Sequence, residues 1–145
     1  MTDPLDQVRE RRAGLRAAIG RVERSLASPA AGRAEVWAKE LASELQDLAA
    51  SLEQHIRANE APDGLLADVV DHAPRLAHRT DQLRDDHARL RAAASAVLDD
   101  LGAPELSVTA VRDQVVELLE GLVRHRHLGA DLVYEAYNVD IEAAD

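Results

Sequence analysis

Residues 41–64, LASELQDLAASLEQHIRANEAPDG, decide the fold of this chain. Apolar side chains recur there at the three- and four-residue spacing that marks one face of an α-helix: Leu41, Leu45, Leu48, Leu52 and Ile56. The Pro-Asp-Gly sequence at 62–64 then ends the pattern, because these residues favour turns. We therefore predict a long amphipathic helix over Ala34–Glu60, with His55 at the edge of its apolar stripe.

The same spacing outside this stretch predicts three more long helices, at Pro4–Leu26, Pro74–Leu101 and Ser107–Tyr137. A short apolar piece at Leu65–Val70 reads as a connecting helix, since prolines and glycines bracket it. Four amphipathic helices with short connections predict an all-α fold. The expected architecture is an up-down-up-down four-helix bundle with a short connecting helix between the second and third long helices.

The length and composition of the chain favour one domain over residues 1–145. The chain has 145 residues, of which 46% are hydrophobic, enough for one core and too few for two comfortable ones. Aromatic residues are 2%, and Ala and Leu dominate, a composition that favours helix over sheet. We expect a mobile tail from about residue 138, where three acids, Asp140, Glu142 and Asp145, have no basic partner nearby in sequence.

Charge and hydropathy exclude several classes of function. The formal net charge of −10 opposes binding to a phosphate backbone, so no nucleic-acid partner is expected. No apolar run approaches the roughly 20 residues of a membrane span, and the N-terminus lacks a signal-peptide pattern, so we expect a cytoplasmic protein without a membrane partner. Cysteine is absent, so a metal site must use imidazole, carboxylate or water ligands.

Three of the six histidines carry the main chemical signal. His55, His87 and His125 each fall on the apolar stripe of a different predicted helix, where leucine is expected. His127 is displaced from His125 by about 200° around the helix axis and is expected to face solvent. Three imidazoles converging from three helices, with a carboxylate or water, make a sensible open metal site. Periodicity alone does not decide whether they share one depth in the bundle.

The predicted metal ligands are His55, Glu60, His87 and His125. Glu60 and Asp86 are the carboxylates nearest to these histidines in sequence, and Glu60 is assigned to the site. A second interpretation stays open, in which each histidine is a core-edge residue hydrogen-bonded to a carboxylate or backbone group of a neighbouring helix.

The histidine-bearing segments also resemble hemerythrin-like (HHE cation-binding) proteins. The resemblance rests on LAASLEQHIRANEAPDGLL at 48–66, LRDDHARL at 83–90 and LVRHRHLGADLVYEAY at 122–137. It implies a four-helix bundle that holds non-haem iron through histidines and carboxylates. Members of that family bind oxygen or sense oxygen, nitric oxide or iron.

The ligand pattern that the resemblance implies is only partly present. His55 takes the place of the second-helix histidine, but Asn59 stands where the family has glutamate, and Glu60 comes one residue late. His87 and His125 resemble ligands of the third and fourth helices. The first helix has no histidine, and Arg11 or Arg12 lies near the missing ligand. A buried arginine disfavours a second cation, so one metal, or none, fits better than two.

Two functions from different classes follow from these patterns. The first is a hemerythrin-like protein that binds non-haem iron, mononuclear or dinuclear, or another divalent metal, for binding or sensing oxygen, a small molecule or redox state. Its partners are the metal ion and a small diatomic ligand. The second is a metal-free bundle that binds a protein partner or forms a homodimer. No nucleophile elbow or phosphate loop is present, so an enzyme is the less favoured hypothesis.

Overall fold

The computed structural model describes residues 3–138. The secondary structure of this part of the chain is entirely helical, with short turns between the helices and no strand. Four long helices account for most of it, and a short helix and a 3-10 turn connect the middle pair. The elements are α1 (Pro4–Ala27), α2 (Ala34–Glu60), α3 (Leu65–His72), η1 (Pro74–Leu76), α4 (Ala77–Leu101) and α5 (Val108–Tyr137). The predicted all-α class is confirmed for the described residues.

The observed boundaries follow the sequence pattern closely, with one correction. We predicted that the third long helix begins at Pro74, but residues Pro74–Leu76 form a 3-10 turn and α4 begins at Ala77. In this turn the Leu76 amide donates to the carbonyl of Ala73, three residues back, at 2.9 Å. Proline has no amide hydrogen to add to a longer helix, and 3-10 turns are common at helix N-termini.

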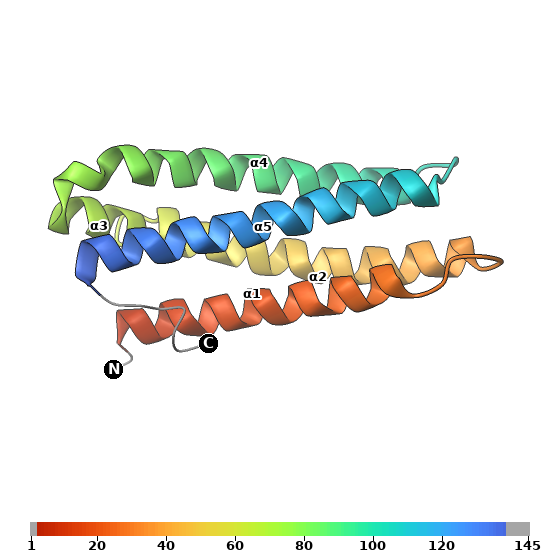
Figure 1. Cartoon of the computed structure of the whole chain (residues 1–145), viewed down its shortest axis with the longest axis horizontal. Helices are drawn as coiled ribbons and strands as arrows, with labels where there is room; N and C mark the ends of the chain where they lie inside the picture. Colours follow the sequence, from red (N-terminus) through yellow and green to blue (C-terminus); the bar gives the residue numbers. More distant parts are fainter. Residues whose placement is uncertain (1–2, 139–145) are drawn as a thin grey trace.

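Figure 1 shows the four long helices lying side by side along the long axis of the molecule. The α1–α2 and α4–α5 connections lie at one end, and α3 with η1 lies at the other. At that second end the Tyr137 hydroxyl donates to a carboxylate oxygen of Asp68, which ties the end of α5 to α3. Asn138 ends α5 in the left-handed conformation, with φ of 57°. The rest of the expected mobile tail lies outside the described residues.

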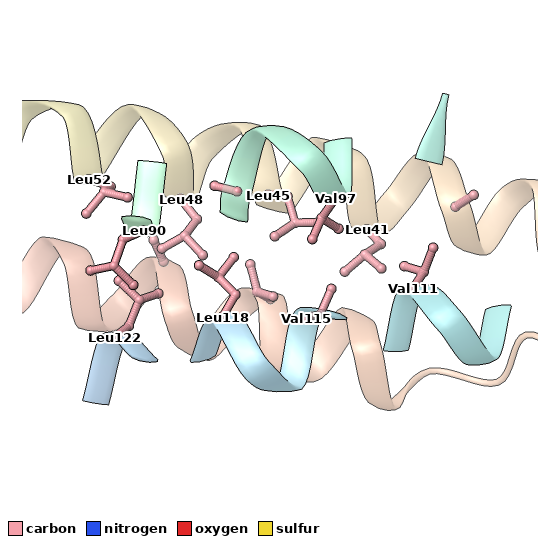
Figure 2. Close-up of a cluster of buried hydrophobic side chains, with 14 of the residues drawn as sticks. Leu41, Leu45, Leu48, Leu52, Leu90, Val97, Val111, Val115, Leu118 and Leu122 are labelled. Carbon is pink, nitrogen blue, oxygen red and sulfur yellow. The ribbon is translucent and has the colours of Figure 1, made fainter. Parts of the chain in front are cut away.

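The main core fills the half of the molecule that includes the α1–α2 and α4–α5 connections. Figure 2 shows leucine and valine side chains from α2, α4 and α5 packed together in this cluster. Its labelled members are Leu41, Leu45, Leu48, Leu52, Leu90, Val97, Val111, Val115, Leu118 and Leu122. A smaller cluster lies near α3, formed by Leu66, Val69, Ala73, Leu76, Leu83, Leu132 and Ala136.

Gly64 makes the sharp connection from α2 to α3 possible. A Cβ atom at this position would lie 2.3 Å from the carbonyl oxygen of Ala58, closer than any real contact, so a larger residue would push α3 away from α2. Gly121, within α5, lets α4 and α5 approach closely, because a Cβ there would lie 3.1 Å from Leu90 Cδ2. None of the helices in residues 3–138 is long and apolar enough to cross a membrane.

Candidate metal centre

His55, His87 and His125 form one layer between the two apolar clusters. His55 follows Leu52 by one helical turn on α2, and His125 follows Leu122 by one turn on α5. On α4, His87 lies between Leu83 of the smaller cluster and Leu90 of the larger one. The three imidazoles therefore share one depth in the bundle, the point that periodicity could not decide.

The three rings meet through their Nε2 atoms. His125 Nε2 lies 3.2 Å from His55 Nε2 and 3.1 Å from His87 Nε2. Two nitrogens bound to one tetrahedral zinc ion at about 2.0–2.1 Å would lie about 3.3–3.4 Å apart, and a right-angle geometry would bring them to about 2.9 Å. These two separations fall between the two values, and the three ligand atoms all lie within 4.8 Å of one another, so His125 has the spacing of a ligand that shares one metal ion with either neighbour.

Two of the rings are held from behind by carboxylates. His87 Nδ1 lies 2.7 Å from Glu60 Oε2, and His125 Nδ1 lies 2.6 Å from Asp86 Oδ2. When these carboxylates are ionised they accept only, so each Nδ1 carries the proton and each Nε2 presents a lone pair to the centre. Metal-binding histidines in proteins are oriented in this way by hydrogen bonds from the second ring nitrogen.

The contact between His87 and His125 is one that a cation between the rings would stabilise. With both Nδ1 atoms protonated, two Nε2 lone pairs face each other across 3.1 Å, and neutral imidazoles cannot both act as acceptors in one contact. A proton or a metal ion at the centre would remove the repulsion. Which of the two cations is favoured depends on how readily the imidazole rings take up a proton, that is, on their pKa values.

Burial favours the neutral rings. It is the main cause that lowers the pKa of all three histidines, and for His55 it lowers the pKa to about 3, with further contributions from His125, His87 and Arg12. The Glu60 and Asp86 carboxylates act in the opposite direction on His87 and His125 without reversing the shift. Neutral imidazole is the form that binds a transition metal.

His55 differs from the other two in what lies behind it. The Asn59 amide nitrogen donates to the His55 carbonyl at 2.7 Å and lies 3.2 Å from His55 Nδ1. An N–H donor at Nδ1 favours the tautomer with its proton on Nε2, and this proton points toward His125. His87 and His125 thus present Nε2 lone pairs to the centre, whereas His55 would have to change tautomer to do the same.

The structure separates the predicted ligands into two groups. The three histidines converge, but Glu60 lies behind His87, on the side away from the shared centre. Its position suits a residue that orients a ligand. Asp86, considered only as a nearby carboxylate in the sequence, has the equivalent position behind His125. The amphipathic pattern contained no signal for this role, because it depends on contacts between helices.

The remaining histidines lie away from the centre. His72, His78 and His127 are exposed, as the helical projection predicted for His127, and Asp131 is exposed as well. Arg12 of α1, by contrast, is buried and has an exposed fraction of 8%. Its NH1 atom donates to the carbonyl oxygen of Arg126 at 3.4 Å, so a backbone group of α5 is one acceptor for this guanidinium.

Comparison of the chain with family models, with curated proteins and with solved structures finds no match. The candidate site is therefore argued from the contacts of the described residues.

Proposed function

We propose that this chain is a metal-binding four-helix bundle with up-down-up-down topology, in which one divalent transition metal is held by His55, His87 and His125. The observation that carries the proposal is the meeting of three Nε2 atoms in a layer where two rings are already fixed by carboxylates at Nδ1. Three neutral imidazoles leave further coordination positions for water or a small ligand. Glu60 and Asp86 orient His87 and His125.

The resemblance to hemerythrin-like proteins leads us to propose non-haem iron as the metal, and binding or sensing of oxygen, another small molecule or redox state as the use. We infer a mononuclear site, because no carboxylate joins the three Nε2 atoms within residues 3–138. The nearby Arg12 charge also disfavours a second cation. Iron bound there would supply an exchangeable ligand position and a redox change.

The direct test is metal content after anaerobic reconstitution. Chelator-treated protein is incubated with iron(II), and separately with zinc(II), then desalted and analysed for bound metal. We expect about one equivalent for the wild-type chain and none for His87→Ala or His125→Ala, because two of the three ligands then remain at most. Wild-type protein that retains neither metal would overturn the proposal.

Two exposed histidines provide matched controls. His127 lies on the same helix as His125, and His78 lies on the same helix as His87. His127→Ala and His78→Ala should therefore keep the full metal content. Loss of metal in these variants would mean that uptake occurs at surface imidazoles and not in the layer. His87→Leu separates ligand loss from unfolding, because a leucine side chain can fill the space of His87 in the histidine layer between the two apolar clusters.

The Asn59 contact favours one part of the second hypothesis, that the histidine layer is metal-free. In that case the Nε2 proton of His55 belongs to a hydrogen bond with His125, and the layer is a structural network. Asn59→Asp distinguishes the two. An isosteric acceptor at His55 Nδ1 should tighten metal binding if His55 is a ligand. If the layer only supports the fold, both the Asn59→Asp variant and the wild type should be metal-free.

A further inference from the structure

A cavity of about 360 Å³ lies against the histidine layer, between α1 and α5. Most of its wall is aliphatic, contributed by residues that include Val8, Leu15 and Ile19 of α1 and Leu122 and Val133 of α5. The side chains of His55, His87 and His125 form part of the same lining. A water molecule takes up about 30 Å³ and small-molecule sites begin near about 300 Å³, so this space suits an organic ligand.

The cavity exists because α1 packs mainly on α2 and has few close contacts with α5. Glycines at two positions of its wall, Gly20 on α1 and Gly129 on α5, add no side chains to fill the gap. A Cβ atom on Gly129 would lie 3.8 Å from Arg12 NH1, so the guanidinium lies directly beside this bare stretch of α5. The gap is thus mainly apolar, and its charged lining residues are Arg12, Arg16, Glu23 and Arg126.

Arg12 brings this positive charge close to the histidines. It lines the cavity with them, and its charge contributes to lowering the pKa of both His55 and His125, after burial and the neighbouring rings. The guanidinium already donates to the Arg126 carbonyl. Because it has five N–H donors in a planar fork, it can hold more than one acceptor at once.

The charges around the layer determine what kind of ligand fits. A divalent ion on three neutral imidazoles keeps both its charges, and Arg12 adds a third. Glu60 and Asp86 offset two of these from behind the rings. Among the other charged residues that line the cavity, Arg16 and Arg126 outnumber Glu23, so the charge facing the aliphatic wall is positive, and a carboxylate on an apolar ligand would offset it.

We propose that the cavity binds an aliphatic monocarboxylate, with its carboxylate between the bound metal and Arg12 and its hydrocarbon tail along the aliphatic wall between α1 and α5. The proposal rests on the metal site proposed above. The ligand of that site would then be an aliphatic carboxylate, which is larger than a diatomic gas. A carboxylate suits both partners, because it can give one oxygen to a metal ion and pair with the planar guanidinium fork.

The test uses the full chain loaded with cobalt(II), whose visible absorption reports changes in coordination. Cobalt uptake is measured first, by elemental analysis. Acetate, butyrate, hexanoate and octanoate are then titrated, with hexan-1-ol as a control that has a tail and no charge. We expect the spectrum to change with each acid, and the affinity to rise about fourfold per added methylene until the cavity is full. Hexan-1-ol should leave the spectrum unchanged.

Two results would overturn the proposal, and they differ in what else they overturn. If cobalt is bound but hexanoate binds no more tightly than acetate, the metal site stands and the monocarboxylate site does not exist. If cobalt is not taken up at all, the metal centre itself is refuted, and the ligand site with it.

Variants locate the carboxylate and the tail separately. Arg12→Gln should weaken hexanoate binding at least tenfold and leave cobalt uptake intact, whereas Arg21→Gln, on the same helix but paired with Glu44 outside the cavity, should do neither. Leu15→Phe reduces the space for the tail, so the preferred acid should become shorter. An unchanged chain-length preference in Leu15→Phe would refute the tail site even if Arg12→Gln fails to fold.

Discussion

The two halves of the molecule use the same helical stripes in different ways. In the half that Figure 2 shows, leucine and valine from three helices fill the space between them. In the other half the stripes of α2, α4 and α5 carry His55, His87 and His125, and an open space separates α1 from α5. One half is a closed hydrophobic core, and the other has polar groups and a cavity at core positions.

This difference is the reason for placing the candidate site in the open half. A cavity and three partly desolvated imidazoles both cost stability relative to packed leucine, because lost contacts and buried polar groups are unfavourable. The closed half supplies the stability that the open half lacks. A chain that needed only to fold would place aliphatic residues in the histidine layer as well.

The largest effect that separates the halves is expected from leucine truncation. Leu45 is fully buried in the closed half, and Leu45→Ala should lower the free energy of unfolding by about 2–5 kcal/mol. Leu15 packs against the main cluster but also lines the cavity and is only partly buried, so Leu15→Ala should cost only about 1 kcal/mol. Urea unfolding followed by circular dichroism measures both. Equal losses would show that the cavity half is packed as tightly as the core.

Metal addition should stabilise the whole fold, but only through contacts in the open half. At a free metal concentration one hundred times the dissociation constant, the wild-type chain should gain about 3 kcal/mol of unfolding free energy. His87→Leu should show no such gain but start from a more stable metal-free state, since leucine suits the apolar layer. Leu45→Ala should start lower and gain as much as the wild type. A metal-dependent rise in Tm for His87→Leu would contradict the assignment of His87.

The carboxylates behind the rings should have a moderate effect on metal affinity. Asp86→Asn removes the charged acceptor at His125 Nδ1 and should weaken metal binding about tenfold to a hundredfold. Asp85→Asn is the matched control, because this neighbouring side chain is exposed. Isothermal titration with zinc(II) on both variants gives the comparison. Equal affinities would show that Asp86 does not orient a ligand.

The sequence predicts the helices and their faces well, because both depend on local pattern. Three- and four-residue spacing places His55, His87 and His125 on core-facing stripes and His127 on an exposed face; in the structure His87 and His125 are buried, His55 is partly buried and His127 is exposed. Helix ends follow from local signals too, and both ends of α2 agree with the prediction. The 3-10 turn at Pro74–Leu76 was missed, since the pattern of apolar residues does not separate it from an α-helix.

Features that depend on the distance between helices could not be predicted. Whether the histidines share one depth is set by the positions of α2, α4 and α5 along one another, which depend on the connection at Gly64 and on the close approach of α4 to α5 at Gly121. The carboxylate contacts of Glu60 and Asp86 depend on the same placement. The cavity is a matter of poor packing between α1 and α5, and an amphipathic stripe carries no signal for it.

The smallest effect is expected from pH, and it again distinguishes the two halves. His55 in the metal-free fold has a pKa lowered to about 3 by burial, then by His125, His87, Arg12 and Arg11, whereas in the unfolded chain it returns to about 6.5. Between these values the unfolded chain binds a proton that the folded chain does not, so stability falls as pH falls below about 6.5. Chelator-treated protein should lose about 1 kcal/mol through His55 between about pH 7 and about pH 5.5. His55→Leu should reduce this slope in urea titrations at several pH values and leave the part due to His87 and His125, because burial lowers their pKa values too. Leu45→Ala should shift the whole curve down and keep its shape. A wild-type slope in His55→Leu would mean that the histidine layer is open to water, and the contrast between the halves would then rest on the cavity alone.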